Sequence, residues 1–311
     1  MDIFLQQVIN GLTLGSVYAV VALGYTMVYG IIQLINFAHG EVVMIGAMVA
    51  FSVITALARA PTGLPPLAIL IAGVLVAIPV CMGVGYTLER VAYRPLRKAP
   101  RLAPLITAIG LSIILQHVAM IIWSRNPIAF PQIIAVTPIH ITDNPNGATI
   151  TNVQVVIILT SVLMMAGLLA LVYRTKLGIA MRATSQNQQV AGLMGIDIDR
   201  VIVFTFILGS ALAGAAGVMF ALRVPTNVSI GFIAGLKGFI AAVIGGIGSI
   251  PGAMAGGLIL GFLESYIQGY VHGAHIPDGT QWSDLYVFSV LIVLMLFRHQ
   301  GLLGRPDIRK V

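Results

Sequence analysis

The sequence is short of acidic residues and of charge in general. Only 10 of its 311 residues are Asp or Glu, and charged residues make up 9% of the chain, whereas apolar residues make up 58%. A water-soluble protein of this length carries roughly 25% charged residues, which it needs to cover its surface. The shortage therefore excludes an ordinary soluble fold and predicts a chain that folds in lipid.

Other absences exclude whole classes of chemistry. The single cysteine, Cys81, lies in an apolar run, so no intrachain disulfide is expected and the thiol is predicted to pack in the core. No phosphate loop of the form G-x-x-x-x-G-K-[ST] occurs, which excludes ATP hydrolysis by that motif. The histidines are scattered, so no catalytic residues are predicted, and an intramembrane enzyme is disfavoured. His272 and His275, with Asp278 nearby, are too few for a closed zinc site, so no metal is predicted.

What the chain does have is a series of continuous apolar runs. A hydrocarbon core about 30 Å thick needs about 20 helical residues per crossing, and continuous rather than alternating runs indicate helices. The predicted fold is an all-α, polytopic transmembrane helix bundle with about 8–9 crossings. The expected helices are Val8–Tyr29, Glu41–Leu57, Leu67–Leu88, Pro104–Trp123, Val153–Tyr173, Val201–Leu222, Gly235–Ile244, Ala253–Tyr270 and Asp284–Phe297.

The net charge of +7 is concentrated in three segments, which argues against nucleic acid as a partner. Basic residues gather between apolar runs or after the last run, and such segments stay on the cytoplasmic side of a membrane. The C-terminus is therefore expected inside the cell and the N-terminus outside. The clusters comprise Arg90, Arg94, Arg97, Lys98 and Arg101; Arg174, Lys176, Arg182 and Arg200; and Arg298, Arg305, Arg309 and Lys310.

One predicted helix, Gly235–Ile244, is too short to cross a bilayer. It is followed by a stretch rich in glycine and proline, Gly245–Gly252, and then by a longer helix, so a broken helix pair is expected near residues 235–270. Broken helices at membrane depth are tolerated only against protein or a water-filled cavity, and they often mark a transport site.

Polar residues within or beside the apolar runs are the candidates for a translocation path. A charge at the centre of a membrane helix costs roughly 2.5–3.5 kcal/mol, so each such residue needs a partner, a cavity or an interfacial position. Glu41 also has a simpler interpretation, because Asn36 can cap the second helix and leave Glu41 near its positive end. Lys237 and Glu264 have the alternative of pairing with each other. The candidate path residues are Asn36, His39, Glu41, Lys237, Gly245, Gly246 and Glu264.

Two internal patterns concern organisation within one permease domain, residues 1–311. Gly15-Ser16 and Phe37–Gly40 resemble Gly209-Ser210 and Ile233–Gly235, which favours either an inverted repeat with halves 1–173 and 201–297 or a chance likeness. Small residues also recur at four-residue spacing, and this favours close helix packing over a dimer seam or a sliding contact. These pairs are Gly11 and Gly15, Ser210 and Gly214, Ala213 and Gly217, Gly252 and Gly256, and Gly257 and Gly261.

The segment 174–200 lies between two apolar runs and should be cytoplasmic. Gln186–Met194 has helical propensity, with Val190, Leu193 and Met194 as its large apolar residues. A short amphipathic helix in a cytoplasmic loop suits docking onto a cytoplasmic partner. The alternative is a helix that lies on the lipid surface, but its polar residues are glutamines rather than the lysines that such helices favour.

Together these segments resemble the H-type permease subunits of branched-chain amino acid ABC importers. The resemblance covers nearly the whole chain. It is carried by Gly24–Gly30 with Asn36–Glu41, by Thr175–Arg182 with Ala191–Ile196, by Ser210–Gly217, and by Leu236–Phe239 through Gly245–Gly257 to Gly261 and Glu264.

The resemblance implies a multi-pass protein of the bacterial inner membrane, in contact with lipid. It implies a second permease subunit in a heterodimer, two cytoplasmic ATPase subunits that bind the ATP, and a periplasmic substrate-binding protein. The permease itself would need no cofactor. The implied substrate is leucine, isoleucine or valine, although relatives that carry urea or short amides keep that alternative open.

The same resemblance assigns the coupling of transport to ATP. The implied ATPase-coupling residues are Arg182, Ala183, Ala191, Gly192, Gly195 and Ile196. The chain departs from the general importer pattern because Gln188 or Gln189 stands where a glutamate often precedes the alanine. A rival hypothesis is a secondary transporter or channel that works without ATPases, with Glu41 or Glu264 as its ion site.

Overall fold

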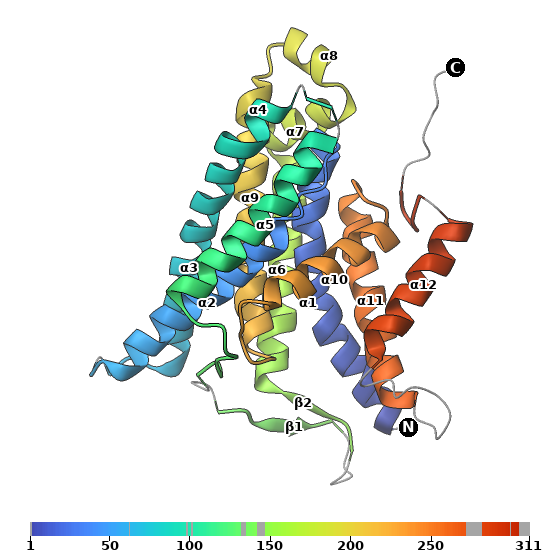
Figure 1. Ribbon diagram of the computed structural model, residues 1–311. Coiled ribbons are helices and arrows are strands. Elements are labelled where there is room, and N and C mark those ends of the chain that lie inside the picture. The colour runs from blue at the N-terminus through green and yellow to red at the C-terminus, as the bar shows by residue number, and fades with distance from the viewer. Residues whose placement is uncertain are drawn as a thin grey trace.

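A 31-residue helix, α1 (Asp2–Ile32), forms the centre around which the other helices pack. Its apolar side chains are buried from Val17 to Leu23 on every face, whereas those of the peripheral helix α5 (Leu102–Ile122) are mostly exposed. The structure is a computed structural model that describes residues 2–61, 63–97, 99–100, 102–131, 135–141, 147–271, 282–298 and 300–304. Within these residues the fold is an all-α bundle with one small hairpin, as the sequence predicted (Figure 1).

The helices confirm the predicted apolar segments, with ends that differ by a few residues. Seven are long and apolar enough to cross a membrane, and two shorter apolar helices, α10 and α12, bring the described set close to the predicted number of crossings. The remaining elements are α2 (His39–Arg59), α3 (Pro66–Leu88), the π-helical turn η1 (Glu89–Tyr93), α4 (Arg94–Leu96), α6 (Asn152–Arg174), α7 (Lys176–Gln186), α8 (Gln188–Leu193), α9 (Ile198–Ala221), α10 (Ile230–Gly245), α11 (Ile250–Tyr270) and α12 (Ser283–Phe297).

The two ends of the bundle differ as the charge pattern predicted. In Figure 1, α4, α7 and α8 lie at the upper end, whereas the start of α1 and the hairpin of β1 (Pro138–His140) and β2 (Thr149–Thr151) lie at the lower end. The upper end carries the described basic clusters and is therefore the cytoplasmic end. The N-terminal start of α1 is accordingly external. The last described residue, Gly304, lies beside Gly246.

Three elements differ from the sequence prediction. The short helix begins at Ile230 rather than Gly235. Gly231 and Gly235 are poor helix formers, but both lie inside this helix, where they contact α2. With 16 residues it is about 24 Å long, still less than the hydrocarbon core. The third helix continues past Leu88 through η1 into α4. The segment 174–200 holds two helices, split at Asn187, rather than one.

The four-residue spacing of small residues serves packing within this chain, as the sequence favoured. Gly11 and Gly15 of α1 lie against Gly257–Phe262 of α11, and a Cβ on Gly15 would come within 2.8 Å of Leu258 Cα. Gly214 of α9 meets Gly46 of α2 in the same manner. Helices with such glycines can bring their backbones into contact. In lipid the hydrophobic effect does not drive helices together, so these close van der Waals contacts stabilise the bundle. Cys81 is buried at the α9 crossing, consistent with a packing role.

Candidate functional site

The connection between α1 and α2 breaks the helical structure inside the bundle. The chain leaves α1 through Gln33, whose φ of 59° is the left-handed conformation that few non-glycine residues adopt. Asn36 does not cap α2, since the N-cap residue is Ala38 and no side chain bonds there. Instead Asn36 Oδ1 accepts hydrogen bonds from the Ala38 amide at 3.1 Å and from the Tyr93 hydroxyl at 2.8 Å. Asn36 therefore ties this connection to η1.

His39 and Glu41, in the first turn of α2, are both buried and point in different directions. The imidazole of His39 packs edge-on against Tyr25, with ring centres 4.6 Å apart, and its Nε2 has no hydrogen-bond partner. Glu41 Oε1 accepts a hydrogen bond from Ser112 Oγ at 3.0 Å, and Oε2 has no partner. The position of Glu41 at the positive end of α2 is as predicted.

A second break in the helical structure lies between α9 and α10, and the helices that follow the two breaks, α2 and α10, are in contact. Gly40 in the first turn of α2 faces α10 so closely that a Cβ on it would lie 2.8 Å from Gly235 Cα. Gly24 of α1 likewise faces the Gly209 carbonyl of α9. The unit of α1, the first break and α2 thus crosses the unit of α9, the second break and α10 at glycines on both sides. An inverted repeat would have this arrangement. The repeat itself stays a prediction.

Lys237 and Glu264 form an ion pair, one of the two arrangements that the sequence left open. Lys237 Nζ lies 2.7 Å from Glu264 Oε1 and 2.9 Å from Asp284 Oδ1, so it joins α10, α11 and α12. Glu264 Oε2 also accepts a hydrogen bond from the Tyr18 hydroxyl at 2.9 Å, and Gln268 donates to Oε1. Both carboxylate oxygens are satisfied. This cluster therefore holds helices together rather than presenting a free group.

Removal of the Glu264 carboxylate should strongly destabilise the protein. Glu264→Ala leaves Lys237 buried with only Asp284 beside it, and a buried ion pair that loses one partner typically costs about 3–5 kcal/mol. We expect a clearly lower midpoint of thermal unfolding in detergent. The double variant Lys237→Met with Glu264→Leu should recover much of that loss, and an additive double variant would contradict the assignment of a pair.

Gly245 and Gly246 form the turn between α10 and α11, on the cytoplasmic side. Gly246 has a φ of 102°, a conformation open to glycine and strained for other residues. The last carbonyls of α10 are capped from far along the chain, because Leu302 N donates to Ile244 O and Leu303 N to Gly245 O, each at 2.9 Å. The predicted path residues thus fall in three separate places: the first break, the Lys237 cluster and this turn.

The cytoplasmic segment 174–200 places α8 at the upper tip of the molecule (Figure 1). Asn187 caps α8 by accepting a hydrogen bond from the Val190 amide, and Gly195, with a φ of 84°, forms the turn that follows α8. Leu193 is 86% exposed and Met194 79% exposed, so two large apolar side chains stand at a polar end of the protein. Gln188 Nε2 donates to Ile31 O at 2.8 Å, which joins α8 directly to the end of α1.

The residues that the resemblance assigned to coupling have unequal positions. Arg182 is exposed and lies over the ring of Tyr173, 5.2 Å from its centre, and Ala183 is half-buried. Ala191 is buried, and its carbonyl accepts from the Ile196 amide, so these two close the end of α8. Gly192 is exposed and Gly195 supplies the turn. Ala191, Gly195 and Ile196 therefore shape the segment, while Leu193 and Met194 form its surface.

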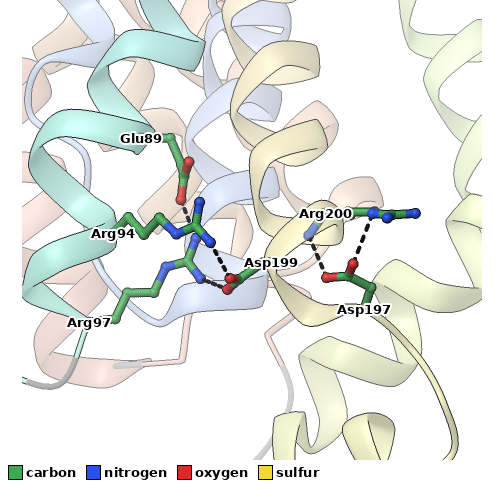
Figure 2. Close-up of polar contacts among 6 residues, drawn as sticks. All are labelled: Glu89, Arg94, Arg97, Asp197, Asp199 and Arg200. Carbon is green, nitrogen blue, oxygen red and sulfur yellow. Dashed lines mark hydrogen bonds and ion pairs between the residues drawn. The ribbon is translucent and has the colours of Figure 1, made fainter.

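An ionic network at the base of this segment joins the third helix to α9. Figure 2 shows Arg94 and Arg97 converging on Asp199 in the first turn of α9, at 2.6 and 2.5 Å. Arg97 also bonds Glu89, whose side chain is fully buried. Arg200 pairs separately with Asp197, the N-cap of α9. The network fixes η1 and α4 against the helix that follows α8.

Sequence reasoning missed this network and the hydroxyl partners Tyr18, Tyr93 and Ser112. The only available signal was a hydroxyl or a carboxylate in or beside an apolar run, as at Glu89, and no spacing rule links residue 97 to residue 199. Among the described residues, no group of three His, Cys, Asp or Glu side chains is placed to hold a metal ion. His272, His275 and Asp278 lie outside the described residues.

These features define a helical membrane protein with breaks between α1 and α2 and between α9 and α10, and with a short exposed helix, α8, on its cytoplasmic end. Residues 7–296 match the family model described as the permease component of the branched-chain amino acid transport system. The chain belongs to this family of permeases, and it is a multi-pass protein of the inner membrane.

Relatives of known name match almost the whole chain. The high-affinity branched-chain amino acid transport system permease protein BraD of Pseudomonas aeruginosa is 46% identical over 99% of this chain and 98% of its own. The corresponding protein LivH of Escherichia coli K12 is 44% identical over 99% of this chain and 98% of its own. A probable LivH from Methanocaldococcus jannaschii is 27% identical over 93% of this chain. No solved structure was found to match.

Proposed function

We propose that this protein is the permease subunit through which a branched-chain amino acid enters the cytoplasm, driven by ATP that separate subunits bind and hydrolyse. The observation that carries the proposal is the exposed apolar tip of α8, formed by Leu193 and Met194, on a chain that resembles such permeases from end to end. Large apolar side chains exposed at a polar surface indicate an interaction site.

Because separate subunits bind and hydrolyse the ATP, the permease requires several partners. A second permease subunit completes the transmembrane unit, two ATPase subunits dock at the cytoplasmic end, and a periplasmic binding protein delivers the substrate at the external end. The permease binds no cofactor of its own. If ATP drives transport, a chain without a phosphate loop depends on separate ATPase subunits, and their motion must then reach the membrane helices.

The contact between α8 and α1 supplies a short mechanical route for that motion. Gln188 of α8 holds the Ile31 carbonyl in the last turn of α1, and the strained Gln33 follows directly. Asn36, His39 and Glu41 come next along the chain. A displacement of α8 by the ATPases would therefore be passed to the first break directly, in addition to its neighbours α7 and α9.

Uptake into proteoliposomes tests the proposal. The complete transporter, with binding protein outside and ATP inside, should accumulate labelled leucine, and the permease reconstituted alone should not. Accumulation by the permease alone, driven by a proton or sodium gradient, would establish the secondary transporter instead. Uptake of urea or a short amide in place of leucine would keep the permease mechanism and replace the substrate.

A single substitution tests the route through Gln188. Gln188→Ala removes the hydrogen bond to Ile31 O, and the exposed side chain leaves no cavity. We expect ATP hydrolysis to continue while the leucine moved per ATP falls several-fold. Gln189→Ala, on the neighbouring exposed side chain, is the matched control and should leave this ratio unchanged. An unchanged ratio in the Gln188 variant would remove the route.

A further inference from the structure

Glu41 is a buried carboxylate at mid-depth in the bundle with one oxygen left free. Its side chain is 2% exposed, and its Oε1 is held by Ser112 at 3.0 Å. Ser112 stands halfway along α5, equally far from Leu102 and Ile122, which places the carboxylate close to the bilayer midplane. Oε2 has no hydrogen-bond partner.

The free oxygen faces the start of a second helix. Oε2 lies so close to Gly231, in the first turn of α10, that a Cβ there would be 2.6 Å away. Glu41 itself belongs to the first turn of α2. Each helix N-terminus carries about +0.5 elementary charge, so two positive ends converge on one carboxylate.

This arrangement differs from that of Glu264, the buried carboxylate of α11. Glu264 has Lys237 as a counter-ion and hydrogen bonds on both oxygens. No lysine, arginine or histidine forms an ion pair with Glu41 in the part of the chain that the structure describes. A buried ion without a partner costs several kcal/mol, so a purely structural Glu41 would be an expensive substitute for glutamine.

We propose that Glu41 and the N-terminal ends of α2 and α10 form a site for the charged backbone of a zwitterionic amino acid. Oε2 accepts a hydrogen bond from the substrate's ammonium group, and the substrate's carboxylate faces the two positive helix ends. The site as a whole has nearly no net charge but separates its charges, which matches a zwitterion and not urea or an amide. This assignment rests on the proposed function and adds the group that selects the substrate class.

The covering helix makes such a site accessible by a small movement. Ser112 of α5 bonds one oxygen of Glu41, and Gly231 of α10 lies against the other. Few residues of α5 are buried in this bundle: Pro104, Ala108 and Ala119. Separation of α5 from α2 would break the bond from Ser112 to Glu41, and at the end of α5 the bond from Trp123 to Ser52, and would uncover the carboxylate. The same carboxylate then stands beside the two broken connections, where a passing solute meets backbone amides as well.

The test uses the complete transporter in proteoliposomes and follows leucine uptake. Glu41→Gln keeps the volume and an oxygen for Ser112 but removes the charge. A charge-assisted hydrogen bond lost from a buried site lowers kcat/KM by about 10- to 100-fold, and we expect a loss in this range. ATP hydrolysis stimulated by the loaded binding protein should persist, which reports a folded and docked permease. Leucine uptake at the wild-type rate would overturn the proposal.

Thr107→Val is the control variant on the covering helix. Its hydroxyl donates only to the Ala103 carbonyl of the same helix, at 2.9 Å, so uptake should stay at the wild-type level. This control separates the loss of charge at Glu41 from the loss of any polar group near α5.

A labelling experiment on the unaltered protein does not depend on how a variant folds. An apolar carbodiimide reacts with carboxyl groups inside membranes, and mass spectrometry locates the product. Leucine should slow the labelling of Glu41 during ATP turnover, whereas 4-methylpentanoate, which lacks the ammonium group, should not. Labelling of the paired Glu264 should not depend on leucine and serves as the internal control. Equal protection of Glu41 by both solutes, or by neither, would refute the site.

Different results would contradict the proposed function and the site at Glu41. If wild-type vesicles take up no branched-chain amino acid, the proposed function fails. Protection of Glu41 by other zwitterionic amino acids, measured with the same label, would then still support the site, and lack of protection by every one of them would remove it.

Discussion

Replacement of Leu193 and Met194 by aspartate is expected to abolish ATP-driven uptake and to leave the permease folded in the membrane. Both side chains are largely exposed at the tip of α8, so the fold loses little when they change. An ATPase that covers them would lose about 1.5–3 kcal/mol for each side chain and would have to bury two carboxylates. The affinity for the ATPase should therefore fall by at least about 100-fold.

Co-purification and uptake measure this loss separately. The ATPase subunits should no longer elute with the variant, and uptake in proteoliposomes should fall to background. Gln186→Asp, at an exposed residue at the end of α7, introduces one negative charge in the same segment and should behave like the wild type. Normal co-purification of the double variant would show that the partner docks elsewhere.

Gly261→Leu is expected to prevent accumulation of the folded protein. A Cβ at this position would meet the backbone of Gly15, and it would lie 2.6 Å from the Gly11 carbonyl. Backbone atoms of α1 cannot move aside without separating the central helix from α11. Overpacking in a tight core costs about 1–3 kcal/mol even where side chains can adjust, and here they cannot.

Gly83→Leu provides the matched control for that change. Gly83 is also a glycine inside a membrane helix, but nothing lies within 4 Å of a Cβ built on it. The variant should accumulate in the membrane at the wild-type level, whereas Gly261→Leu should be degraded. Measured by immunoblot of membrane fractions, equal amounts of the two variants would contradict a tight α1–α11 crossing.

The sequence predicted the helices well, because a bilayer permits few alternatives to a long apolar helix. It was less accurate where tertiary contacts overrule local propensity. The start of α10 was placed at Gly235, five residues too late, whereas Gly231 and Gly235 both lie inside the helix and let Gly40 of α2 approach closely. The continuation through η1 had no local signal, because a π-turn depends on what its side chains meet.

The candidate site could be predicted only in part, for a similar reason. Polar residues in apolar runs singled out Asn36, His39, Glu41, Lys237 and Glu264, but not which of them are satisfied. The pair of Lys237 and Glu264 joins residues 27 positions apart, and the bond from Tyr18 to Glu264 joins residues 246 apart. The difference between a paired Glu264 and a half-paired Glu41 arises from these distant partners and becomes visible only in the fold.

The caps on α10 have a consequence for how the protein is made. The carbonyls of Ile244 and Gly245 accept hydrogen bonds from the amides of Leu302 and Leu303, which lie beyond α11 and α12 in the sequence. During translation those carbonyls lack their native partners until the ribosome has made residues 302 and 303, which come much later in the chain. The cytoplasmic end of α10 is therefore completed only after the rest of that helix has been made, and deletion of residues 300–304 would remove the caps of a distant helix.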